Sequence, residues 1–80
     1  MRLRPLPFRE VRRRLIAAGW AEVGITGSHV KFAKRIATSL RTAIVPKHRE
    51  IAAGTLQSIL RQAGIGWEEL DQLGVCRRLR

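Results

Sequence analysis

A histidine and a lysine separated by one residue are the part of this sequence best suited to chemistry. His29 and Lys31 alternate with the apolar residues Val30 and Phe32, so in a β-strand they would share one face. Histidine can give or take a proton near neutral pH, and a neighbouring lysine can stabilise negative charge that develops on a phosphate. The pair suits acid–base chemistry on a phosphodiester. The alternative is a solvent-exposed strand histidine with no function. Judged by its residue type alone, His29 fits this alternative better.

Two small residues before His29 add hydrogen-bond donors. The Ser28 hydroxyl and the backbone amides around Gly27 could donate to a phosphate oxygen, and glycine allows a close backbone approach. RNA carries its own nucleophile, the 2′-hydroxyl. A ribonuclease therefore needs a base for that hydroxyl, positive charge at the phosphate and an acid for the leaving oxygen.

A second basic group, Lys47, His48 and Arg49, directly follows Pro46. His48 is a candidate second proton carrier, with an inert loop residue as the alternative. Lys47 and Arg49 are candidate phosphate-binding residues, and a solvated loop is an equally good interpretation of them.

The sequence predicts neither a metal site nor a cofactor. Glu22, Glu50 and Asp71 lie too far apart in the sequence to indicate a carboxylate cluster for magnesium. Cys76 is the single cysteine, so no intrachain disulfide or cysteine-based zinc motif is expected. A reduced, cytoplasmic location fits this cysteine usage, and we expect no signal peptide and no membrane span.

Length and charge predict one small domain that attracts polyanions. The chain has 80 residues, of which 45% are hydrophobic, and 16 lysines and arginines against six acids give a formal net charge of +10. We expect a single domain over residues 1–80, with its core at 8–73 and a basic tail at 74–80. The charge favours a nucleic-acid partner, with a ribosome-associated protein or a surface that meets an acidic protein as alternatives.

Apolar periodicity predicts helices and strands in a definite order. A helix should begin near Phe8 and stop at Gly19, with an apolar stripe at Phe8, Val11, Leu15 and Ala18. The further expected segments are a strand at about 21–25, a strand at 29–33, a basic connection at 34–39, a strand at 40–45 with Leu40, Thr42 and Ile44 on one face, a loop at 47–53, a helix at 54–63 and a short helix at 67–73. We interpret Trp20 and Trp67 as core residues.

This order predicts a two-layer α+β domain. Short connections favour a three-stranded antiparallel sheet, with the helices on one face and the other face open to water. His29 and Lys31 would lie on the open face.

Three stretches in this order and spacing resemble the HicA toxins. They are GSHVKF at 27–32, IVPKH at 44–48 and GTLQSILRQAGI at 54–65, and the helix ending in LIAAGW at 15–20 is also similar. The resemblance implies a fold like that of double-stranded-RNA-binding domains, cleavage of mRNA, and a HicB-type antitoxin that covers the active face. It makes His29 the catalytic residue. The 34–39 connection lacks the proline, acidic residue and glycine usual in that family's second hairpin.

Two other functions remain open from the sequence. A non-catalytic double-stranded-RNA-binding module would bind RNA tightly without cutting it. A basic protein-interaction module would bind an acidic partner and show little affinity for RNA at physiological salt.

Overall fold

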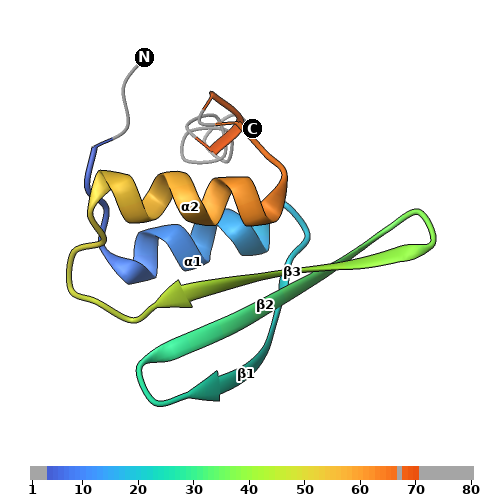
Figure 1. Ribbon diagram of the computed structural model, residues 1–80, viewed down its shortest axis with the longest axis horizontal. Helices are drawn as coiled ribbons and strands as arrows, with labels where there is room; N and C mark the ends of the chain where they lie inside the picture. Colours follow the sequence, from blue (N-terminus) through green and yellow to red (C-terminus); the bar gives the residue numbers. More distant parts are fainter. Residues whose placement is uncertain (1–3, 67, 71–80) are drawn as a thin grey trace.

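The computed structural model describes residues 4–66 and 68–70, and it confirms the α+β fold (Figure 1). Its elements are α1 (Phe8–Ala17), β1 (Ala21–Thr26), β2 (His29–Ile36), β3 (Ser39–Pro46) and α2 (Ala53–Ala63). Residues 68–70 are also helical, whereas the rest of the predicted third helix, Trp67 and the 74–80 tail lie outside the described residues. None of the helices described is long and apolar enough to cross a membrane.

Both predicted amphipathic helices form where the sequence places them. Pro7 is the extended N-cap residue of α1, and proline is tolerated at a helix start because the N–H that it lacks would have no helical partner there. Gly64 ends α2 with φ 76°, a left-handed conformation that glycine adopts without a Cβ penalty. Gly19 has φ 98° just after α1, as the glycine stop predicts.

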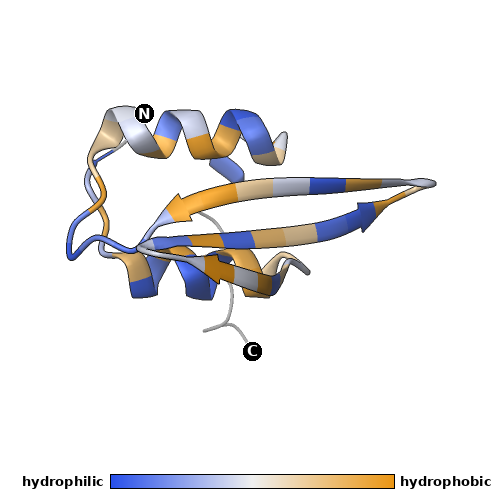
Figure 2. Cartoon of the chain, turned by 60° about the horizontal axis from the view of Figure 1, so that its bottom comes forward, coloured by the Kyte–Doolittle hydropathy of each residue, from blue (hydrophilic) through white to orange (hydrophobic). Residues whose placement is uncertain are grey.

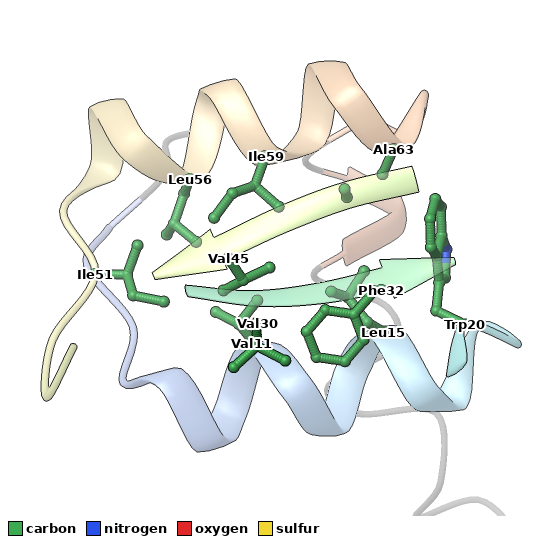
Figure 3. Close-up of a cluster of buried hydrophobic side chains, with 11 residues drawn as sticks. Val11, Leu15, Trp20, Val30, Phe32, Val45, Ile51, Leu56, Ile59 and Ala63 are labelled. Atoms are coloured by element: carbon green, nitrogen blue, oxygen red, sulfur yellow. The ribbon is translucent and has the colours of Figure 1, made fainter. Parts of the chain in front are cut away.

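The sheet is antiparallel with strand order β1-β2-β3. Both helices contribute to one apolar core against one of its faces (Figure 3). The helix residues are Val11, Leu15, Leu56, Ile59 and Ala63, and the strand residues are Val30, Phe32, Ala43 and Val45. Trp20 is buried in the same cluster, as expected. None of the helices in residues 4–66 and 68–70 covers the opposite sheet face, and hydrophilic and hydrophobic segments alternate along β2 (Figure 2).

The prediction of a basic connection at 34–39 is wrong. The strands continue to Ile36 and resume at Ser39, leaving a turn of two residues, Ala37 and Thr38. Ala37 has φ 56° without being one of the residues that favour such turns. The basic residues ended the apolar alternation in the sequence, but long cationic side chains are compatible with a strand that extends past the core. The hairpin indeed projects beyond the ends of both helices (Figures 1 and 2).

Two cations of this hairpin connect it to the helices. Lys34 and Arg41 are opposite one another in the β2–β3 register. Lys34 Nζ donates to the carbonyl oxygen of Ala18 (2.6 Å), and Arg41 Nε donates to that of Gln62 (3.0 Å). Both acceptors lie at helix C-terminal ends, where carbonyls lack helical partners and cations are favoured.

The two edges of the sheet differ. On the outer strand β3, the backbone N–H of Ile44 donates to Oε1 of Gln62 on α2 (2.9 Å). A side chain of the helix therefore occupies one of the strand's edge donors. All six residues of β1, the other edge strand, are exposed.

Candidate active site

A two-residue turn delivers His29 to the start of β2. Thr26 and His29 are opposite one another in the β1–β2 register, with Gly27 and Ser28 between them. Gly27 has φ 61°, and a Cβ added there would meet no atom within 4 Å. The backbone conformation, rather than lack of space, is therefore what favours glycine at this position.

The alternation along β2 agrees with the sequence. Val30 and Phe32 are fully buried against the helices, whereas His29 and Lys31 are exposed. Successive side chains of a strand point to opposite faces, so His29 and Lys31 lie together on the uncovered side of the sheet, which we call the open face. An imidazole at this position is accessible to a large polymeric substrate.

Lys47, from the second predicted basic group, lies beside the turn that carries His29. His29 is opposite Pro46 in the β2–β3 register, and the backbone N–H of Lys47 donates to the carbonyl oxygen of Ser28 (2.6 Å). The structure thus brings Gly27, Ser28, His29 and Lys47 to one end of the sheet, although Lys47 is 18 positions after His29 in the chain.

The remaining two candidates lie further along the same loop. His48 and Arg49 are exposed, and the His48 carbonyl accepts from the N–H of Phe8 in α1 (3.3 Å). Leu6 and Ile51 form an antiparallel bridge that ties this loop to the chain before α1. Among the described hydrogen bonds, none joins His48 or Arg49 to the Gly27–Ser28 turn, so their participation stays a prediction.

The open face receives no acidic side chain from the strands. Between residues 21 and 46 the only acid is Glu22. Its partner across the sheet is the buried Phe32, which places it on the helix side, and there it accepts from Arg12 Nε (2.8 Å). Lys31 and Lys47 form no ion pair with an acid of the described residues. Their charge is therefore available to an anion.

A second carboxylate is also held within the helix layer. Glu10 accepts from Arg13 and from Arg14 Nε (2.8 Å) one turn further along α1. The hydrogen bond from Arg13, together with that from Arg14 and the charges of both arginines, keeps the Glu10 pKa below its ordinary value, although partial burial acts in the opposite direction. These arginines of α1 are thus engaged in ion pairs.

Two residues of the open face escaped the sequence analysis. Thr26 carries a hydroxyl directly opposite His29, and Arg35 lies three alternations along β2 from His29 and is exposed. Continuing the alternation past Ala33 would have found Arg35. Thr26 has no comparable signal, because its position depends on the hairpin register.

Leu40, Thr42 and Ile44 share one face of β3, as expected. That face is the open one, because the intervening Ala43 and Val45 are fully buried. Within residues 4–66 and 68–70, no three histidine, cysteine, aspartate or glutamate side chains gather as metal ligands would.

The sequence matches a known protein family. A family model described as "HicA toxin of bacterial toxin-antitoxin" matches residues 8–65, which include both strands of the candidate site and both helices. Comparison with curated proteins and with solved structures gives no significant match.

Proposed function

Since the chain belongs to the HicA family of toxins of bacterial toxin–antitoxin systems, we propose that it acts as an endoribonuclease on mRNA, with His29 as its catalytic residue. The observation that carries this proposal is the exposure of His29 beside Lys31 on a sheet face to which the strands contribute no acid. A polyanion can approach that face without meeting a carboxylate of the strands.

In this proposal His29 moves the protons of the reaction. Its neutral imidazole accepts the proton of a ribose 2′-hydroxyl as that oxygen attacks the adjacent phosphorus. The bond from phosphorus to the 5′-oxygen breaks, and the leaving oxygen takes a proton from an acid. His48 is the candidate for that second role, and His29, once protonated, is the alternative donor.

The neighbouring donors stabilise the phosphate. Lys31, two residues along β2 from His29, and Lys47, which directly follows β3, supply positive charge, and the amides at Gly27 and Ser28 supply hydrogen bonds to the non-bridging oxygens. Arg49 is exposed in the loop that follows and would contact a phosphate outside the cleaved bond. These side chains require no metal for their roles, so we predict that cleavage proceeds in EDTA.

The direct test compares wild type, His29→Ala and His48→Ala on end-labelled mRNA in EDTA. We expect wild type to cleave and His29→Ala to lose at least about a hundredfold in rate, the lower range for general acid–base catalysis. Equal cleavage by wild type and His29→Ala would reject His29 as the catalytic residue. An unchanged rate in His48→Ala would leave His29 as both base and acid.

The cleavage assay together with a salt titration of RNA binding separates the two other functions. Tight, salt-sensitive RNA binding without strand scission by wild type would identify a non-catalytic RNA-binding module. Absence of both cleavage and RNA binding at physiological salt would leave the protein-interaction module.

Membership of a toxin–antitoxin family implies an antitoxin partner. We propose that this antitoxin is of the HicB type and that it covers the open face, because an acidic protein surface would complement the cations there and exclude RNA. Adding purified antitoxin should then inhibit cleavage in proportion to the complex formed. A stable complex that cleaves RNA at the uninhibited rate would contradict coverage of this face.

A further inference from the structure

The open face continues well past His29 along the projecting β2–β3 hairpin. Residues at every second position of β2 share this face, and they are His29, Lys31, Ala33 and Arg35. Resting on the proposed function, we infer that RNA lies along this hairpin, with Arg35 binding a phosphate several nucleotides from the one beside His29.

The distance suits an extended polyanion. At about 3.3 Å per strand residue, Arg35 lies about 20 Å along β2 from His29 and about 13 Å from Lys31. A site for one or two nucleotides would not need a cation so far from the reacting bond. The hairpin extends beyond both helices (Figure 1), and Arg35 is exposed on this distant part, whereas Ala33, between Lys31 and Arg35, is only 8% exposed.

The basic residues of the hairpin divide between its two sides. Lys34 and Arg41 point toward the helices and bond the carbonyls of Ala18 and Gln62. Arg35 is exposed, and the residue opposite it is Leu40, which is 62% exposed. Lys34 and Arg41 hold the hairpin on the helices, whereas the guanidinium of Arg35 is on the side where RNA would lie.

The side chains between Lys31 and Arg35 on the open face are small. Ala33 stands between them on β2, with Ala21 and Thr42 opposite it on the two outer strands. Gly24 is opposite Lys31, and a Cβ added there would meet no atom within 4 Å. Small side chains at these positions leave the backbone of a polymer free to pass between the two cations.

The composition of this face indicates contact with phosphates rather than with bases. Phe32 is the only phenylalanine, tyrosine or tryptophan between residues 21 and 46, and it is fully buried. Apart from the imidazole of His29, the strands therefore offer no ring on which bases could stack. Binding along the hairpin should accordingly depend on salt and tolerate many sequences.

The test measures binding by His29→Ala protein, so that cleavage does not consume the RNA. Arg35→Gln, Arg35→Lys and Arg61→Gln are each added to this background and titrated with a fluorescent single-stranded 20-mer of mixed sequence. Arg61 is an exposed residue of α2 and controls for net charge. We expect Arg35→Gln to weaken binding roughly threefold to tenfold and to lower the slope of log K against log salt by about 0.7, with Arg35→Lys restoring most of both.

Binding of a short RNA distinguishes an RNA contact of Arg35 from a merely structural role. A structural role would affect the binding of short and long RNA alike. A dinucleotide is too short to reach from His29 to Arg35, about 20 Å away along β2, so Arg35→Gln should bind it as well as the background protein does. Unchanged 20-mer affinity in Arg35→Gln, an equal loss in Arg61→Gln, or an equal loss with the dinucleotide would each overturn the inference. If wild type fails to cleave RNA while the length-dependent loss is present, the nuclease proposal fails and the hairpin path remains.

Discussion

The backbone N–H of Lys47 donates to the carbonyl oxygen of Ser28 at 2.6 Å, one residue before His29. This bond joins the end of β3 to the turn that carries His29, and it does not involve the lysine side chain. The position of the Lys47 backbone and the charge of its ammonium group can therefore be tested separately.

Lys47→Met should leave the fold intact and weaken RNA binding. The variant keeps the backbone hydrogen bond but removes one cation from the end of the sheet, so we expect a several-fold higher KM at moderate salt and a salt slope lower by about 0.7. Cleavage rates measured over a range of RNA concentrations, at several salt concentrations, give both the KM and its salt dependence. A thermal midpoint equal to that of wild type is the control, and an unchanged slope would contradict a phosphate contact.

Two leucines should differ sharply in their contribution to stability. Leu56 is 1% exposed and packs in the core, whereas Leu40 is 62% exposed on the open face. Leu56→Ala should lower the free energy of unfolding by about 2–5 kcal/mol, because it leaves a cavity. Leu40→Ala should change it by less than about 0.5 kcal/mol. Urea denaturation of both variants measures the difference, and similar losses would contradict the assignment of faces on β3.

Two left-handed backbone positions should respond in opposite directions. Ala37 has φ 56° in the hairpin turn, so Ala37→Gly should stabilise the chain by up to about 1 kcal/mol. Gly64→Ala should destabilise it, because φ is 76° and the new Cβ would come within 2.9 Å of the Arg41 guanidinium. Thermal melts of the two variants check the signs. Stabilisation by Gly64→Ala would contradict both the backbone conformation and the contact with Arg41.

Lowering the pH should remove the contribution of Glu10 to the stability of the fold. Because Arg13 and Arg14 lower its folded-state pKa, this stabilisation is present above the unfolded-state pKa and is lost as the pH falls through the folded-state value. Glu10→Gln should therefore be less stable than wild type at neutral pH, by under about 1 kcal/mol for a partly exposed pair, and the two should converge in acid. A stability difference that is constant with pH would argue against this ionisation.

Much of the fold could be predicted because short-range patterns agreed with the tertiary structure. The stripes that contain Val11 and Leu15 in α1, and Leu56 and Ile59 in α2, are the ones that the core buries. The exposure of His29 followed from the alternation with Val30 and Phe32, since burial of one set leaves the other outside. In each case a single periodicity decided the outcome.

The hairpin was mispredicted because its strand residues do not pack as core residues. Lys34 and Arg41 stay within the strands through bonds to helix carbonyls 16 and 21 positions away, and no local pattern predicts such partners. The candidate site could likewise be predicted only in part from the sequence. The contact of Lys47 with Ser28 depends on the β2–β3 register, and a register joins residues that are distant in the chain.

The hydrogen bonds from Lys34 to Ala18 and from Arg41 to Gln62 also affect the loss of conformational entropy on binding. A free two-stranded arm would lose backbone and side-chain freedom when a polymer settled on it, and affinity would fall by that entropy. Here each strand of the arm is fastened to the end of a different helix, so its orientation is set before any ligand arrives. Loosening either fastening should weaken association even though neither cation touches the polymer.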